Sequence, residues 1–150
     1  MAMNREVKIR ILSQYKWLLD EVAYLKKQKE ECRINKLSPR AIEYSGMPKG
    51  SGGNSDLSSY AAKIDMYERD IDAMLQTSIE KKRKIMEWIA KLTDTQGRMI
   101  LVYRYIEGDK IELIAEKMGC VDKTIRVKHR EAVEELPDNY EIMEMFGIKE

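Results

Sequence analysis

Hydrophobic residues recur at steps of three and four along two long segments of the chain. The first segment, from about Asn4 to Asn35, contains neither Pro nor Gly, and the second runs from Asp56, a candidate N-cap, to about Leu92. The first carries a wide apolar stripe: Ile11, Leu12, Tyr15, Leu18, Leu19, Val22 and Leu25. The second carries heptad positions: Leu57, Tyr60, Ile64, Tyr67, Ile71, Met74, Ser78, Ile85, Trp88 and Leu92. Two helices of similar length with such seams predict an antiparallel helical hairpin.

The two helices are separated by residues 36–56, which are rich in Gly and Pro and therefore predict a loop. The loop contains MPKGSGG, which invites comparison with a phosphate-binding loop. The spacing GxxxxGK followed by Ser or Thr is absent, however, and the pattern predicts no strand before it. The sequence favours a connector or a contact with a partner.

Residues 92–136 predict three short helices with tight connections. Asp94 is a candidate N-cap for the first helix and Gly108 its end, with Met99, Ile100, Tyr103 and Ile106 as the buried stripe. Asp109 is expected to start the second helix and Gly119 to end it, with Ile111, Ile114, Ala115 and Met118 on one face. Asp122 is expected to cap the third, with Ile125, His129, Ala132, Val133 and Leu136 inside. The short turn containing Gly119 predicts a helix-turn-helix.

The outer side of the third helix, 122–136, carries more bases than acids: Lys123, Arg126, Lys128 and Arg130 against Asp122 and Glu131. A helix of this width and charge suits the major groove, where Arg and Lys donate to guanine. We expect one set of residues to face base edges: Lys123, Arg126, Val127 and Arg130. We expect a second set to meet phosphates, which orient the protein rather than specify a sequence: Thr124, Lys128, Lys110 and Arg98.

The stretches RYIEG, ELIAEKMG and KTI, within Leu92–Leu136, resemble region four of the bacterial sigma-70 family. The resemblance implies a module that reads a promoter element and touches the flap of RNA polymerase. The chain has Val121 where that family usually has a capping Ser, and His129 where an aliphatic residue is usual. No sigma region two is visible. A hairpin followed by this module is also similar to the ArpU and RinA families of late-gene activators from phages and prophages of Gram-positive bacteria.

The patterns above predict an all-α fold, a long antiparallel helical hairpin followed by a three-helix helix-turn-helix domain. Composition agrees with a helical chain. Charged residues make up 35% of the chain, and Gly and Pro concentrate in one loop, which is typical of long solvated helices. The expected division is a hairpin at 1–92, a helix-turn-helix at 93–137 and a tail at 138–150, with a tail helix packing onto the module. The net charge is only +1, so DNA binding would depend on a local patch and on salt.

Candidate catalytic chemistry is sparse, which predicts a protein that is not an enzyme and needs no cofactor or metal. Two distant cysteines, Cys32 and Cys120, and one histidine do not make a zinc site. His129 is expected to be a semi-buried core residue. The charged amphipathic start is not a signal peptide, and the longest apolar run, near Met99–Tyr103, cannot span a bilayer. These features predict a cytoplasmic protein without membrane contact.

Three functions remain open at this point. The leading hypothesis is a sequence-specific regulator of transcription that binds double-stranded DNA, encoded by a phage or prophage. The second is a DNA-packaging protein similar to a small terminase subunit, and the third is a module that contacts RNA polymerase without reading bases. A homodimer is a further hypothesis, because an operator of two half-sites needs two recognition helices. The basic run Lys81–Lys84 is either a solvated collar or a phosphate contact.

Overall fold

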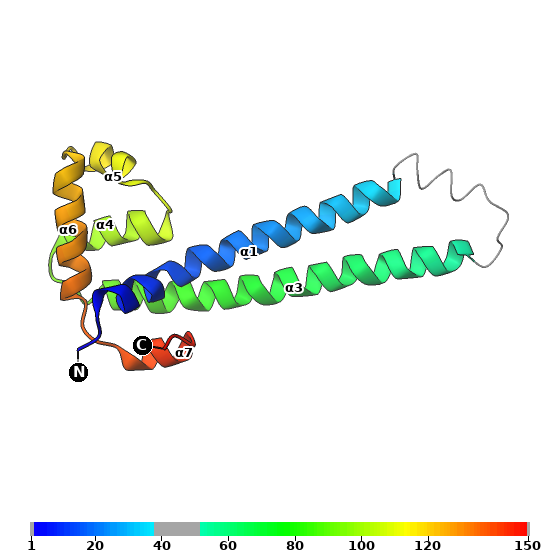
Figure 1. Ribbon diagram of the computed structural model, residues 1–150, viewed down its shortest axis with the longest axis horizontal. Helices are drawn as coiled ribbons and strands as arrows, with labels where there is room; N and C mark the ends of the chain where they lie inside the picture. Colours follow the sequence, from blue (N-terminus) through cyan, green and yellow to red (C-terminus); the bar gives the residue numbers. More distant parts are fainter. Residues whose placement is uncertain (1, 38–51, 150) are drawn as a thin grey trace. The chain divides into compact units, whose positions relative to one another are not determined.

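The computed structural model describes residues 2–37 and 52–149, and this part of the chain is helical without strands (Figure 1). The all-α prediction is therefore confirmed. The elements follow the chain in this order: α1 (Arg5–Leu37), α3 (Gly52–Ile89), α4 (Thr95–Leu101), the π-helix η1 (Val102–Ile106), α5 (Ile111–Met118), α6 (Asp122–Glu135) and α7 (Tyr140–Met145).

The chain divides into two compact units that cut across both long helices. The first unit contains Met1–Leu18 and Ser78–Glu150, and the second contains Leu19–Thr77. In the first unit the start of α1 runs antiparallel to the end of α3, and Lys81 Nζ donates to Gln14 Oε1 over 3.1 Å. The expected boundary near residue 92 lies inside this unit, because the base of the hairpin and the later helices share one core.

That core centres on Trp88, the largest fully buried side chain, which is 1% exposed. Ile11 and Leu12 from α1 and Ile85 from α3 are completely buried in the same cluster. The later helices add Leu101, Tyr105, Ile106, Ala132, Val133, Leu136, Ile142 and Ile148. The expectation that the tail helix packs onto the rest is met by Ile142 of α7. A smaller cluster joins α4, α5 and α6 through Ile100, Ile114, Ala115 and Ile125.

The second unit is the remainder of the two long helices, and it buries few residues. Val22 and Ile71 are its buried hydrophobic residues in the described part, and the Lys29–Glu68 ion pair, at 3.1 Å, shows that the helices run antiparallel here too. Leu57, an expected heptad residue, is exposed. Helix α1 continues to Leu37 and α3 begins at Gly52, so Asp56 lies within α3 and does not cap it. The rest of the expected loop 36–56 lies outside the described residues.

The first helix of the trio begins as predicted but changes its winding halfway. Asp94 is the N-cap, and its Oδ2 accepts from the Gly97 N–H over 3.1 Å. After Leu101 the helix widens into the π turn η1. Residues five apart come closer to one face in a π-helix than in an α-helix, which matches the burial of both Tyr105 and Ile106. The predicted burial of Met99 is wrong, because its neighbours Ile100 and Leu101 occupy the inward positions.

The two glycines expected to end helices do so. Gly108 and Gly119 have φ values of 77° and 66°, in the left-handed region. The two aspartates expected to start helices do not cap them, since the N-cap of α5 is Lys110 and that of α6 is Val121. Asp109 instead binds Lys117, whose Nζ lies 2.6 Å from its Oδ2. Asp122 is the first residue of α6, where a carboxylate still meets the positive end of the helix dipole.

Candidate nucleic-acid interface

Helices α5 and α6 form a compact pair joined by a turn of a few residues. Ile114 and Ala115 of α5 are buried against Ile125 of α6. Helix α4 supports α6 from another side, and it approaches so closely that a Cβ placed on Gly97 would lie 3.2 Å from the Ala132 Cβ. The inner side of α6 is therefore covered by α4 and α5, and its outer side remains for contact with another molecule.

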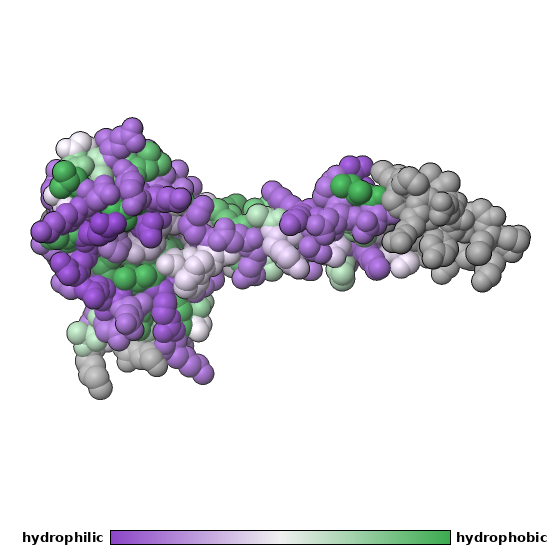
Figure 2. All heavy atoms as spheres, turned by 45° about the horizontal axis from the view of Figure 1, so that its top comes forward, coloured by the Kyte–Doolittle hydropathy of each residue, from purple (hydrophilic) through white to green (hydrophobic). Residues whose placement is uncertain are grey.

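The exposed face of α6 carries Lys123, Val127 and Arg130, which share that face because they are spaced by four and three residues. Lys123 and Arg130 are exposed and Val127 is half-buried. In the view of Figure 2, the surface of the part that contains α4, α5 and α6 is mainly hydrophilic, with hydrophobic residues between the hydrophilic ones. These three residues form what we call the α6 outer face.

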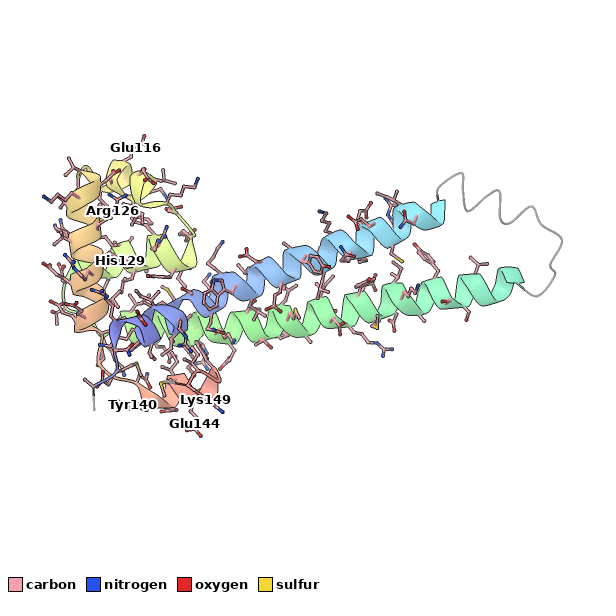
Figure 3. The ribbon with its side chains drawn as sticks, viewed as in Figure 1. Glu116, Arg126, His129, Tyr140, Glu144 and Lys149 are labelled. Atoms are coloured by element: carbon pink, nitrogen blue, oxygen red, sulfur yellow. The ribbon has the colours of Figure 1, made fainter. Side chains whose placement is uncertain are left out.

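Arg126 and Lys128 lie on the two flanks of the α6 outer face. The side chain of Arg126 is 61% exposed, and its Nη2 lies 3.9 Å from Glu112 Oε1 of α5. Figure 3 shows Arg126 on the α5 side of α6. Lys128 leans toward α4, where its Nζ donates to Gln96 Oε1. A duplex lying against the outer face would thus meet cations at the centre and along both edges.

The other expected phosphate contacts lie elsewhere. Thr124 is half-buried near the start of α6, and Lys110 is exposed at the N-cap of α5. Arg98 is engaged locally, because its guanidinium donates to the Leu92 carbonyl over 2.5 Å and to Thr95 Oγ1 over 3.1 Å. Arg98 is consequently the least available of the proposed phosphate contacts.

A family model described as "Protein of unknown function (DUF1492)" matches residues 50–137, more than half of the chain. The chain belongs to the DUF1492 family. No curated protein and no solved structure matches it. The DUF1492 match covers α3 to α6 but leaves out α1 and α7, although both contribute side chains to the same core.

Sequence reasoning missed the residues of α1 that touch the end of α6 in this DUF1492 protein. Arg5 Nη1 lies 3.4 Å from Glu134 Oε1, and Lys8 Nζ donates to the Leu136 carbonyl over 2.6 Å. Periodicity reports only neighbours within a few residues, so it carries no signal for partners more than a hundred positions apart. Gln96, the partner of Lys128, was missed for the same reason.

His129 binds Tyr105 within the module. The Tyr105 hydroxyl and His129 Nε2 are 2.6 Å apart, and the ring centroids are separated by 5.6 Å. Burial raises the pKa of Tyr105 to about 12. Burial, followed by the charges of Arg104 and Arg5, lowers the pKa of His129. A neutral imidazole half-buried on the inner side of α6 serves packing.

The basic run Lys81–Lys84 is largely engaged within the protein. Lys81 Nζ lies 5.1 Å from the centroid of the Phe146 ring and Lys82 Nζ lies 5.9 Å from that of Tyr15. Arg83 pairs with Glu80 and with Glu87. Because these partners lie within the protein, they favour the interpretation of the run as a solvated collar over a phosphate contact.

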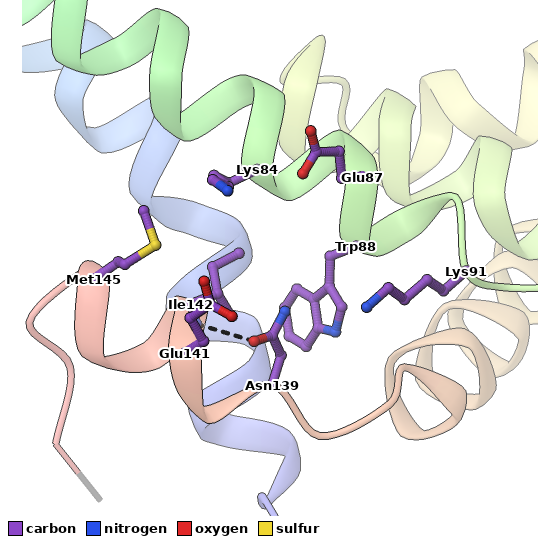
Figure 4. A pocket seen from close by; sticks show the side chains of 8 residues that line it. All are labelled: Lys84, Glu87, Trp88, Lys91, Asn139, Glu141, Ile142 and Met145. Carbon is purple, nitrogen blue, oxygen red and sulfur yellow. Dashed lines mark hydrogen bonds between the residues drawn. The ribbon is translucent and has the colours of Figure 1, made fainter.

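A shallow pocket of about 150 Å³ lies between α3 and α7 (Figure 4). It is lined by Lys84, Glu87, Trp88, Lys91, Asn139, Glu141, Ile142 and Met145. Two lysines and two glutamates balance each other there, so the lining favours neither an anion nor a cation. Within residues 2–37 and 52–149 no group of three or more His, Cys, Asp or Glu side chains could hold a metal ion. No helix in this part is long and apolar enough to cross a membrane.

Proposed function

We propose that this DUF1492 protein is a sequence-specific regulator of transcription that binds double-stranded DNA and reads the major groove with α6. The observation that carries the proposal is the α6 outer face, on which Lys123 and Arg130 are exposed beside the flanking Arg126. The resemblance of Leu92–Leu136 to sigma-70 region four supports it. The similarity of the whole layout to the ArpU and RinA families favours an origin in a phage or prophage.

The chemistry of these side chains fits base recognition. Arginine donates two hydrogen bonds to guanine O6 and N7, which is worth about 1–3 kcal/mol of discrimination against a wrong base. Lys128 and Thr124 on the flank would orient the helix through phosphates. Because the whole chain carries a net charge of only +1, binding depends on these few local cations. We therefore expect a modest affinity that falls with salt, with a slope set by the small number of phosphate contacts.

The test begins with selection of bound sequences from random duplex DNA at two salt concentrations, followed by affinity measurements on the selected duplex. The double variant Arg126→Ala, Arg130→Ala should lose specific binding while its circular dichroism stays helical. Lys27→Ala with Lys63→Ala is the matched control, because it removes the same charge from exposed positions of the second unit. Unchanged affinity of the first variant for the selected duplex would falsify the assignment of α6 to the groove.

A second candidate function is contact with RNA polymerase without base reading. It is favoured by α5, where Leu113 is 41% exposed between Glu112 and Glu116, which are also exposed. Two carboxylates would repel a phosphate backbone, whereas an apolar residue with an acidic rim suits a protein partner. Pull-down with polymerase and with selected DNA, using Leu113→Ala and the double arginine variant side by side, separates the two functions.

A further inference from the structure

The C-terminal end of α6 is held by donors from both helices of the hairpin base. Lys8 Nζ of α1 donates to the carbonyls of Leu136 over 2.6 Å and Glu134 over 3.2 Å. Trp88 Nε1 of α3 donates to the Pro137 carbonyl over 2.7 Å. The last carbonyls of a helix have no partners within it, so these bonds satisfy groups that water would otherwise have to reach.

Lys8 is an unusual residue to find in such a place. Its side chain is only 7% exposed. Lysine is almost never buried to this extent unless its charge is paired. Its ammonium meets the negative end of the α6 dipole and lies 3.8 Å from Asp138 Oδ1. Val7, next to it, is part of the main core. The charge is therefore fixed in position by both packing and hydrogen bonds.

We propose that Lys8 is a positioning residue that sets the orientation of α6 on the hairpin base and so contributes to sequence discrimination. The proposal rests on the proposed function, because discrimination presupposes DNA binding. Hydrogen bonds to base edges require a well-fixed helix, whereas contacts to phosphates tolerate small displacements. Loss of the hydrogen bonds from Lys8 to the end of α6 weakens binding to the selected duplex more than binding to random duplex.

Lys8 lies outside residues 50–137, the part of the chain that the DUF1492 family model matches. The recognition helix of the matched segment thus depends on a charge that the segment does not contain. The N-terminal part of α1 thus contributes to DNA reading although it has no residue on the α6 outer face.

The test compares Lys8→Met, which keeps the length but removes the donors, with Lys8→Arg, which keeps a cationic donor. Lys27→Met, at an exposed position of α1, is the control. For Lys8→Met we expect about tenfold faster hydrogen exchange at the amides of residues 132–136, since hydrogen bonds to a charged group stabilise a folded segment by at least this factor. We expect binding to the selected duplex to weaken by up to the same factor. Binding to random duplex and its salt slope stay unchanged, and Lys8→Arg recovers most of the difference.

The two proposals fail in different ways. If the wild-type protein shows no sequence preference, the proposed function is wrong, while hydrogen exchange still reports whether Lys8 holds the end of α6. If Lys8→Met keeps both the exchange rates and the ratio of specific to random affinity, the positioning role is overturned. Equal weakening on both duplexes overturns it too. Should Lys8→Met not fold, Lys8→Gln, with one neutral donor, decides by the same two measurements.

Discussion

Arg126 has a partner within the protein that competes with the proposed partner in DNA. Its guanidinium and the Glu112 carboxylate are 3.9 Å apart, and the two side chains are 61% and 64% exposed. An ion pair in solvent contributes little to stability, about 0–1 kcal/mol. Glu112 therefore matters less for folding than for the charge that an approaching duplex meets.

We predict that Glu112→Gln binds the selected duplex more tightly, by about two- to fivefold, which corresponds to an exposed ion pair of this size. The substitution releases Arg126 and removes a negative charge near the phosphates. Fluorescence anisotropy at two salt concentrations measures the effect. Glu144→Gln is the control, because Glu144 is exposed on α7, apart from Arg126 in Figure 3. Equal tightening in both variants would show that only net charge matters.

His129 gives the stability of the first unit a pH dependence whose sign follows from its burial. The pKa of His129 is lowered from the ordinary value of 6.5, so below that value the unfolded chain binds the proton more readily than the folded one. Stability is then lost as the pH falls from about 6.5 toward the lowered pKa. Above the ordinary pKa the imidazole is neutral in both states and contributes no slope.

We predict that His129→Leu with Tyr105→Phe has a flatter dependence of stability on pH between 7.5 and 5.5 than the wild-type protein. The second substitution avoids a buried hydroxyl without a partner. Because the chain has a single histidine, the difference between the two proteins isolates its titration from that of the carboxyl groups. Urea denaturation at both pH values measures it. Parallel curves would contradict the assignment.

Among the elements, the sequence predicts those features that neighbouring residues decide, such as heptad burial and the ends of helices. The heptad of α3 predicts that Ile71, Ile85 and Trp88 are buried, and the structure confirms it. Asp94 and Gly119 are predicted to start and to end a helix, and both do so. The stop at Gly119 could be read from sequence because only glycine adopts its φ without strain.

The errors come where another element decides. The π turn η1 could not be predicted, because it places Tyr105 and Ile106 against a core that includes residues of the distant helices α1 and α3. The sequence predicts Asp122 as the N-cap of α6, whereas Asp122 is its first helical residue and Val121 is the N-cap, which makes no side-chain hydrogen bond. Of the candidate site, the α6 outer face was predictable from spacing, and Lys8 and Gln96 were not.

Gly97 controls how closely α4 approaches α6. A Cβ at this position would lie 3.2 Å from the Ala132 Cβ and 3.3 Å from the capping Asp94 Oδ2. Alanine normally favours a helix over glycine by about 1 kcal/mol, but here the two helices would have to separate. We predict that Gly97→Ala is destabilising by about 1–3 kcal/mol, the usual range for overpacking.

A double-mutant cycle checks this prediction, with urea denaturation of Gly97→Ala, Ala132→Gly and the double variant. In the Ala132→Gly background the Cβ contact is gone, so Gly97→Ala should cost less than in the wild-type protein or become stabilising. If Gly97→Ala has the same effect in both backgrounds, the contact with α6 is not what selects glycine.

At the scale of the whole molecule, the two units differ in how much of their surface they bury. The first unit contains all but two of the buried hydrophobic residues of the described part, Val22 and Ile71 being the exceptions. Stability is unevenly distributed in such a chain, and its parts open with different free energies. Leu12 belongs to α1 by sequence, but it packs with the end of α6, because the core that it joins also contains Val133 and Leu136.

We predict that Leu12→Ala, in α1, destabilises the first unit by about 2–5 kcal/mol, the range for a fully buried leucine, and raises hydrogen exchange throughout α4 and α6. Ile71→Ala is the matched substitution in the second unit. It should raise exchange in residues 57–77 and leave α6 protected, because Ile71 is not part of the core that supports α6. Exchange mass spectrometry of both full-length variants, with near-ultraviolet circular dichroism for the packing of Trp88, measures the difference. Comparable loss of protection in α6 from both substitutions would mean that the chain unfolds as one cooperative body and that the hairpin base does not support α6 more than the second unit does.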